Sequence, residues 1–322
     1  MRRTRWLALV LLVGLGACGL VARAARGDPA WRVIAAKPSD FGLTAAQVDM
    51  QSRDHRRVAG WWIAASPDRR GRATVILVHG RGANRGAMLP RAKFLVAAGY
   101  DVLAIDLRAH GDSEGEYTSP GYLEATEVET AIEFARRTSP RPVVLLGHSL
   151  GAVAVLHATS RRPAIAATIA DSAYISPFDL FGRLRERLRE QGAGLWPRIG
   201  LWFAGSRSLA GVLAWMVEMA GGDDVDARRA ELLPVLPRIA RPVLFITGDR
   251  DDLAPPVNAR RMAAAVPVRG TWVVELPAGH QTFDDAPAPY ERAVLGFLAL
   301  VVPDPIGRTG VAVVSGAAPC AK

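Results

Sequence analysis

The chain has 322 residues, half of them hydrophobic, which excludes a disordered or fibrous protein and provides for a sizeable core. Its net charge of +9 comes almost entirely from arginine, because lysine occurs only at Lys37, Lys93 and Lys322. These arginines are scattered and accompany no zinc-finger, helix-turn-helix or RNA-binding motif, so nothing indicates a nucleic-acid partner. The two cysteines, Cys18 and Cys320, exclude a disulfide framework and a cysteine metal cluster.

The first 22 residues have the layout of a secretory signal. Three arginines precede an apolar run from Trp6 to Leu15, and small residues follow it. Residues 15–18 (Leu-Gly-Ala-Cys) resemble the bacterial lipobox, in which Cys18 would be acylated and become the mature N-terminus. Counting on to Ala22 gives about 17 residues, the lower limit for a spanning helix, so an uncleaved anchor is an alternative. We therefore expect an extracytoplasmic, membrane-associated protein, with plain secretion or a periplasmic location as the remaining alternative.

From residue 23 the composition is linker-like up to residue 40. Two strands are predicted at 48–52 and 58–64, with a polar hairpin turn between them. Apolar strand runs then alternate with helical patterns: strands at 74–78, 100–105, 143–147 and 164–170, and helices at 88–98, 122–138 and after residue 151. Parallel strands need helix-sized connections, so this alternation predicts an α/β fold with a mostly parallel sheet covered on both faces.

The alternation stops between residues 176 and 237. An amphipathic helix at 178–189 and an aromatic-rich block at 195–219 predict a helical cap insertion. Its aromatic side chains either pack the insertion's own core, line an apolar substrate pocket or touch lipid. The candidates for the pocket are Trp196, Trp202, Phe203 and Trp215.

The strand and helix pattern resumes after the insertion. Strands are predicted at 242–247 and 271–276 and a helix at 290–300, which gives a core made of residues 41–175 and 238–302. The tail at 303–322 is rich in glycine, alanine and proline, and we expect it to be poorly ordered.

A Gly-x-Ser-x-Gly motif joins the strand run at 143–147 to the helix that follows it. Residues 147–151 read Gly-His-Ser-Leu-Gly, the signature of a nucleophile elbow that lifts Ser149 above a sheet. A serine hydroxyl needs an imidazole to take its proton and a carboxylate to orient that imidazole. Two later strands end in such residues, with carboxylates at 249, 251 and 252 and with His280. The order serine, acid, histidine is the one expected for this arrangement.

These motifs, together with His-Gly-Arg-Gly at 79–82 and Asp-Leu-Arg-Ala-His-Gly-Asp-Ser at 106–113, resemble the α/β-hydrolase superfamily. Within it the chain is similar to serine esterases and peptidase-like proteins that carry an N-terminal membrane segment. The similarity covers about residues 41–300 and departs at Ala109, where the family has glycine. It implies the α/β-hydrolase fold, with Ser149 as nucleophile and His280 as base.

The resemblance also implies the remaining site residues. Family spacing makes Asp251 the acid, leaving Asp249 and Asp252 as loop caps or solvated charges. The backbone N–H groups of Leu150 and Arg81 would form the oxyanion hole. The histidines have no metal-ligand spacing, so neither a metal nor another cofactor is expected.

Together these features predict a serine hydrolase that cleaves a small-molecule or lipid-like ester through an acyl-enzyme, as a carboxylesterase does. Amide, peptide or thioester cleavage uses the same machinery. An acyltransferase differs in the acceptor that meets the acyl-enzyme. A membrane-tethered binding protein without chemistry is the alternative from another class.

Overall fold

The computed structural model describes residues 23, 25–66, 72–161, 164–219, 223–302 and 318–319. The predicted N-terminal signal or anchor and most of the predicted C-terminal tail lie outside these residues. Within the described part of the chain, no helix combines the length and the hydropathy needed to cross a bilayer.

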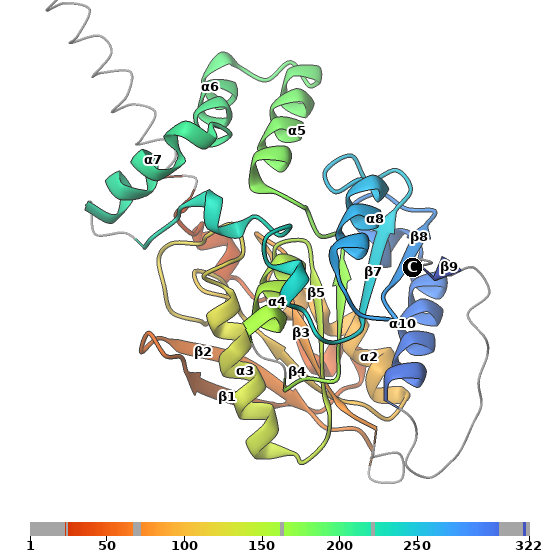
Figure 1. Cartoon of the computed structure of the whole chain (residues 1–322). Helices are drawn as coiled ribbons and strands as arrows, with labels where there is room; N and C mark the ends of the chain where they lie inside the picture. The colour runs from red at the N-terminus through yellow and green to blue at the C-terminus, as the bar shows by residue number, and fades with distance from the viewer. Residues whose placement is uncertain are drawn as a thin grey trace, which may run out of the picture.

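The centre of the molecule is a mostly parallel sheet with the order β1-β2-β4-β3-β5-β6-β7-β8-β9 (Figure 1). Pairing is antiparallel between β1 and β2, β2 and β4, and β8 and β9, and parallel between the other neighbours. The α/β prediction is confirmed. The strands are Ala46–Gln51 (β1), Arg57–Ile63 (β2), Thr74–Val78 (β3), Asp101–Ile105 (β4), Val143–His148 (β5), Ala167–Asp171 (β6), Val243–Gly248 (β7), Trp272–Leu276 (β8) and Ala318–Pro319 (β9).

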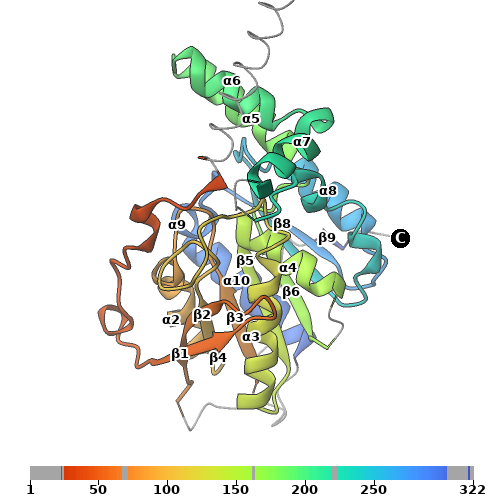
Figure 2. The ribbon, with the colours of Figure 1, turned by 90° about the vertical axis from the view of Figure 1, so that its left-hand side faces the viewer.

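Helices cover both faces of the sheet, as the continuous apolar strand runs predict (Figure 2). In β3, Val75 and Leu77 pack into one core cluster, while Ile76 and Val78 pack into the other. The first cluster includes side chains of α2 and α10, and the second includes side chains of α3 and α4. These helices are Leu89–Ala97 (α2), Ala125–Thr138 (α3), Leu150–Arg161 (α4) and Pro287–Val301 (α10).

Three helices follow the carboxyl end of β6 and project beyond that end of the sheet (Figures 1 and 2). They are Pro177–Glu190 (α5), Leu195–Ala204 (α6) and Arg207–Met219 (α7), and we call them the cap helices. The aromatic-rich block at 195–219 forms two helices, α6 and α7, which are separated at Gly205 and Ser206. The 3₁₀ helices Ala227–Ala230 (η5) and Leu236–Arg238 (η6) lead back to β7.

The described part of segment 23–40 is not a free linker. It forms the 3₁₀ helices Pro29–Arg32 (η1) and Pro38–Phe41 (η2), and Arg26 bridges to Tyr117. The Trp31 ring stacks on His110 with 4.8 Å between centroids. The Arg32 guanidinium donates to backbone carbonyls of the loop after β4, including that of Ser113 at 2.8 Å. The segment therefore braces that loop.

Several short elements escaped prediction from the sequence. They are the 3₁₀ helix Arg85–Met88 (η4) and the helices Pro256–Ala265 (α8) and Thr282–Asp285 (α9). Within the predicted disordered tail, Ala318–Pro319 forms β9 and pairs with β8.

Candidate active site

Ser149 lies at the sharp turn between β5 and α4. Its φ of 52° is in the left-handed region, which a residue other than glycine adopts at an energetic cost. The turn leaves no room for side chains on either side: a Cβ on Gly147 would come within 2.2 Å of the Gly151 carbonyl oxygen, and one on Gly151 within 2.4 Å of that of Val78. The two glycines of the motif are therefore required by packing.

The structure brings Ser149, His280 and Asp251 into one hydrogen-bonded chain. His280 Nε2 lies 2.9 Å from Ser149 Oγ, and His280 Nδ1 lies 2.8 Å from Asp251 Oδ2. An ionised carboxylate only accepts hydrogen bonds, so Nδ1 carries the ring proton and Nε2 is left to accept from the serine hydroxyl. This is the tautomer that a general base needs.

The three carboxylates of the loop after β7 have different partners. Asp251 is 2 % exposed, and its second oxygen, Oδ1, accepts from the N–H groups of Leu253 and Ala254. Asp249 instead accepts from the N–H of Ala278. Asp252 forms an exposed pair with Arg187 of α5. Only Asp251 of the three contacts the histidine.

The carboxyl group of Asp251 stays ionised in this environment. Burial alone would raise its pKa, but the hydrogen bond and charge of His280, together with the backbone N–H donors, hold the pKa below the ordinary aspartate value. The site therefore keeps a carboxylate that can fix the imidazole and stabilise its protonated form.

Two backbone segments flank the serine hydroxyl. Leu150 is the first residue of α4, and the N–H groups of a helix's first turn have no intrahelical acceptor and favour negative charge. Gly80 packs against the elbow, since a Cβ on it would lie 3.3 Å from that of Ser149. The structure thus places Leu150 directly after the serine and Arg81 directly after the glycine that contacts it.

His79 and His110 hold the Arg81 loop against the loop after β4. The N–H of Leu107 donates to His79 Nε2 at 3.0 Å, and the N–H of Gly82 donates to His110 Nε2 at 3.1 Å. Both rings are neutral, because burial lowers the pKa of His79 to about 4 and burial with the adjacent His79 lowers that of His110 to about 3.

Acid is expected to destabilise the fold through such buried histidines, and His157 of α4 gives the cleanest test. Burial lowers its pKa from 6.5 to about 4, so between these values only the unfolded chain takes up the proton. The stabilising contribution is complete above pH 6.5 and is lost as the pH falls toward 4. The loss amounts to about 2 kcal/mol at pH 5. The free energy of unfolding can be measured with urea at pH 7 and at pH 5. Between these pH values it should fall by about 2 kcal/mol less in His157→Leu than in the wild type.

The matched control is His55→Gln, which changes an exposed turn histidine and should leave the pH dependence as in the wild type. The expectation fails if His157→Leu and the wild type lose the same unfolding free energy between the two pH values.

A buried charged network under the elbow was missed from the sequence. The Asp171 carboxylate, at the end of β6, accepts from His148 Nδ1 at 3.1 Å, from Arg91 of α2 at 3.2 Å and from the Thr282 hydroxyl at 2.5 Å. Its backbone carbonyl accepts from the N–H of Ser149. The sequence did contain a signal for this network, because Asp171 directly follows a predicted strand run. The same kind of signal identified the carboxylates of the loop after β7.

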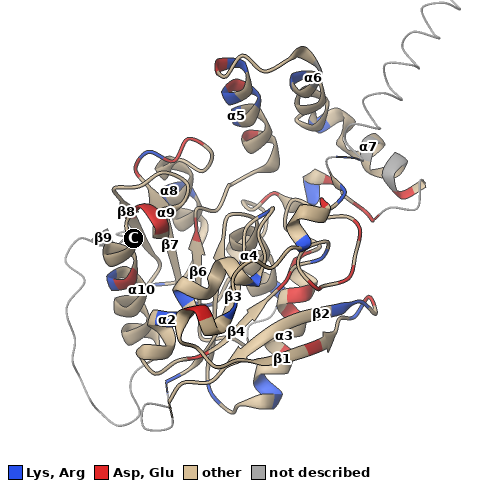
Figure 3. Ribbon diagram, turned by 180° about the vertical axis from the view of Figure 1, so that it is seen from behind, with Lys and Arg blue, Asp and Glu red and all other residues tan. Residues whose placement is uncertain are grey.

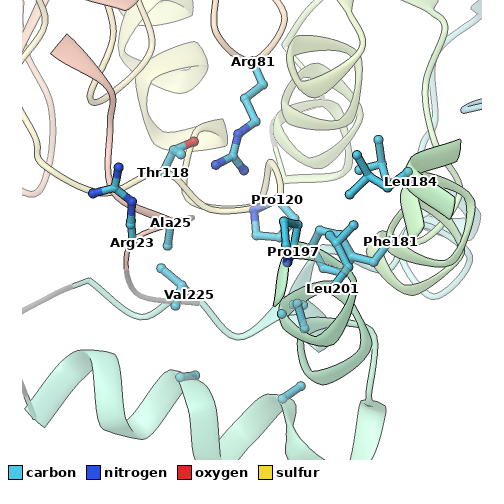
Figure 4. A pocket seen from close by; sticks show the side chains of 16 residues that line it. Arg23, Ala25, Arg81, Thr118, Pro120, Phe181, Leu184, Pro197, Leu201 and Val225 are labelled. Carbon is cyan, nitrogen blue, oxygen red and sulfur yellow. The ribbon is translucent and has the colours of Figure 1, made fainter. Parts of the chain in front are cut away.

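A cavity of about 640 Å³ lies between the cap helices and the loops that carry Arg81 and Thr118 (Figure 4). Its walls are mostly apolar, from the cap helices and the chain next to them. The lining residues are Arg23, Ala25, Arg81, Thr118, Pro120, Phe181, Leu184, Leu188, Pro197, Gly200, Leu201, Ala204, Ala210, Ala214, Val225 and Ala227.

Of the aromatic residues predicted for the pocket, Trp202, Phe203 and Trp215 do not line it, so the prediction is wrong for these three. Trp202 and Trp215 are 53 % and 59 % exposed and face outward, and Phe203 packs edge-on against Trp202. The side chain of Trp196 lies outside the described part of the structure. Unlike α5, helices α6 and α7 carry few charges (Figure 3), so apolar residues face both the cavity and solvent. Leu201 lines the cavity instead.

Among the described residues, no group of three or more histidine, cysteine, aspartate or glutamate side chains could hold a metal ion.

Comparison with known proteins identifies the family of the fold. A model of the alpha/beta hydrolase family matches residues 75–293. YfhR of Escherichia coli is 33% identical over 140 residues, which cover 41% of this chain and 49% of YfhR. The alpha/beta hydrolase domain-containing protein WAV2 of Arabidopsis thaliana is 25% identical over 252 residues, covering 75% and 74%. The chain thus spans about half the length of YfhR and about three quarters of WAV2.

Solved structures share the fold. The esterase Pf2001 of Pyrococcus furiosus superposes with a TM-score of 0.68 at 23% identity, covering 86% of this chain and 98% of that one. A bacterial membrane phospholipase A superposes with a TM-score of 0.58 at 22% identity, covering 94% and 99%. The family model covers more than half of the sequence, and the sheet order and elbow accord with it. The chain belongs to the alpha/beta hydrolase family.

Proposed function

We propose that the protein is a serine hydrolase that cleaves a carboxylic ester through an acyl-enzyme. The observation that carries the proposal is the hydrogen-bonded chain from Ser149 through His280 to Asp251, with distances of 2.9 and 2.8 Å. The esterase and phospholipase structures with the same fold are consistent with this class of reaction.

In the first half of the reaction, Ser149 Oγ attacks the ester carbonyl carbon while His280 Nε2 takes the hydroxyl proton. The carbonyl oxygen becomes an oxyanion, which the N–H groups of Leu150 and Arg81 stabilise. The intermediate collapses when the bond to the alkoxy group breaks, and His280 returns the proton to the departing alcohol. The acyl group is then bound to the serine.

In the second half, water replaces the alcohol. His280 takes a proton from water as the water oxygen attacks the acyl carbon, and the second oxyanion uses the same backbone donors. Breaking the bond to Oγ releases the acid and, with the proton from His280, restores the hydroxyl. Asp251 stays ionised throughout and stabilises the imidazolium that forms in each half.

A fluorophosphonate probe tests the proposal directly. The folded wild-type protein should be labelled at Ser149, and Ser149→Ala should not be labelled. Absence of labelling in folded wild-type protein would contradict the hydrolase proposal and favour a binding protein. Product analysis with an alcohol competing against water separates a hydrolase from an acyltransferase, and a peptide amide series tests peptidase activity.

The cavity is proposed to receive the apolar part of the substrate. Leu201 lines it, while the neighbouring Trp202 faces outward. Leu201→Trp should therefore lower kcat/KM for decanoyl esters by roughly tenfold or more relative to acetyl esters, because the larger ring fills the space needed by the chain. Trp202→Leu is the matched control and should leave the chain-length profile unchanged. A changed profile in the control alone would contradict this assignment.

We further propose that residues 1–22 attach the protein to a membrane outside the cytoplasm, as the signal layout and Cys18 suggest. The exposed side chains of Trp202, Trp215 and Met219 on the cap helices accord with a nearby lipid surface. In fractionated cells, Cys18→Ala should abolish lipidation and move the protein from the membrane to the soluble fraction. Continued membrane retention without lipidation would instead support the uncleaved anchor.

A further inference from the structure

Residues 25–33, which we call the N-terminal strap, join the loop after β3 to the loop after β4. The carbonyl of Trp31 accepts from the N–H of Gly111, in the loop after β4, at 3.1 Å. The carbonyl of Val33 accepts from the side-chain amide of Asn84, in the loop after β3, at 2.9 Å. The strap therefore fixes the two loops relative to each other.

The indole of Trp31 contacts both loops. It stacks on the His110 ring with 4.8 Å between centroids and 10° between the ring planes. It also lies beside Gly82, since a Cβ on that glycine would be 3.4 Å from Trp31 Nε1. His110 Nε2 in turn accepts from the N–H of Gly82 at 3.1 Å. The indole thus holds the imidazole in the orientation in which it binds the Gly82 N–H.

A histidine holds each of the two peptide groups that flank the Arg81 Cα. His79 Nε2 accepts a backbone N–H, so Nδ1 carries the ring proton and donates to the Gly80 carbonyl at 2.7 Å. The peptide group is planar and trans, so fixing this carbonyl also fixes the direction of the Arg81 N–H. On the other side of the Cα, His110 holds the N–H of Gly82. The backbone conformation of Arg81 therefore depends on both rings.

Building on the proposed hydrolase function, we propose that Trp31 is a positioning residue for the oxyanion hole. It acts through His110, which keeps the loop in the conformation that directs the Arg81 N–H toward an oxyanion at Ser149. Gly82 has a φ of 77° and the backbone freedom of glycine, so the loop can leave this conformation when the indole is removed. The oxyanion forms in the transition state, so the loss falls on kcat and spares KM.

Two decanoyl esters, one with C=O and one with C=S at the reacting carbon, test the oxyanion hole, because sulfur is the weaker hydrogen-bond acceptor. Trp31→Ala should lower kcat for the oxygen ester by roughly 10- to 100-fold, the loss expected when a catalytic group is misplaced by about 1 Å. The thiono ester should lose less, so the ratio of kcat for the oxygen ester to that for the thiono ester should fall by roughly tenfold. Trp31→Phe keeps a ring that can stack on His110 and should stay within about threefold of the wild-type ratio.

The matched control is Trp62→Ala, which removes another partly buried tryptophan, packed edge-on against Phe134, and should leave the ratio as in the wild type. Thermal unfolding shows which variants are folded. If Trp31→Ala does not fold, Trp31→Leu, which keeps more bulk but has no flat ring, should show the same fall in the ratio. Equal losses on the two esters, or no loss on either, would overturn the positioning role and leave the hydrolase proposal intact. Turnover independent of Ser149 would instead refute the hydrolase.

Discussion

Ser149→Ala is expected to lower kcat for ester hydrolysis by roughly 10⁶-fold, the size of loss seen when the nucleophile of a serine triad is removed. The substitution takes away the atom that attacks the carbonyl and leaves the rest of the site in place. Alanine also accepts the backbone position about as well as serine, whose φ is 52°, so the protein should remain folded. Steady-state hydrolysis of a decanoyl ester, with thermal unfolding as the folding control, measures both.

The loop that carries Asp251, the proposed acid of the triad, also contains two other aspartates that can serve as controls. Asp251→Asn should lower kcat by about 10⁴-fold, because an amide next to His280 Nδ1 no longer enforces the tautomer that leaves Nε2 free to accept the serine proton. Asp249→Asn and Asp252→Asn remove the same charge two residues and one residue away, where the partners are a backbone N–H and Arg187. They should retain activity within about tenfold of the wild type. Full activity in Asp251→Asn would contradict the triad proposal.

The strands and the elbow could be predicted because their signals are local. A buried parallel strand appears as an unbroken apolar run, and the predicted range 74–78 coincides with β3. The elbow needs glycine at two fixed positions for steric reasons, so its spacing marks the turn directly. Polar residues at strand ends then gather at one edge of a parallel sheet. This topology is why residues 131 positions apart, Ser149 and His280, form a hydrogen bond.

The cap could be predicted as helical but its inner face could not. In α6 and α7, apolar residues occur around most of the helix, so periodicity does not distinguish Leu201, which lines the cavity, from the exposed Trp202. Their size and aromatic character made the tryptophans the predicted pocket residues. Which side chains line the cavity depends instead on how the helices contact the rest of the molecule. The stacking of Trp31 on His110 could not be predicted either, because a linker-like composition does not indicate which distant residue a side chain will contact.

Asp171→Ala is expected to have the largest effect on stability, about 3–5 kcal/mol, because it leaves the Arg91 guanidinium buried without its carboxylate. Arg91 is 4 % exposed, packs on the Phe283 ring and donates to the Tyr290 hydroxyl, so it cannot turn to solvent without opening the core. Thermal unfolding should show a fall in the midpoint temperature of roughly 10 °C.

The control is Asp252→Asn, whose exposed pair with Arg187 should contribute at most about 1 kcal/mol. If Asp171→Ala unfolded no more easily than this control, the buried network would not stabilise the fold.

The network also predicts an effect on activity at temperatures where the variant is folded. Asp171 receives hydrogen bonds from His148, next to the nucleophile, and from Thr282, two residues after the base. One carboxylate thus fixes the elbow relative to the loop that carries His280. Thr282→Val removes a single hydrogen bond to it and should lower kcat more than KM, since chemistry depends on the Ser149–His280 distance more than binding does. If Thr282→Val raised KM and left kcat unchanged, Asp171 would stabilise the fold without positioning the base.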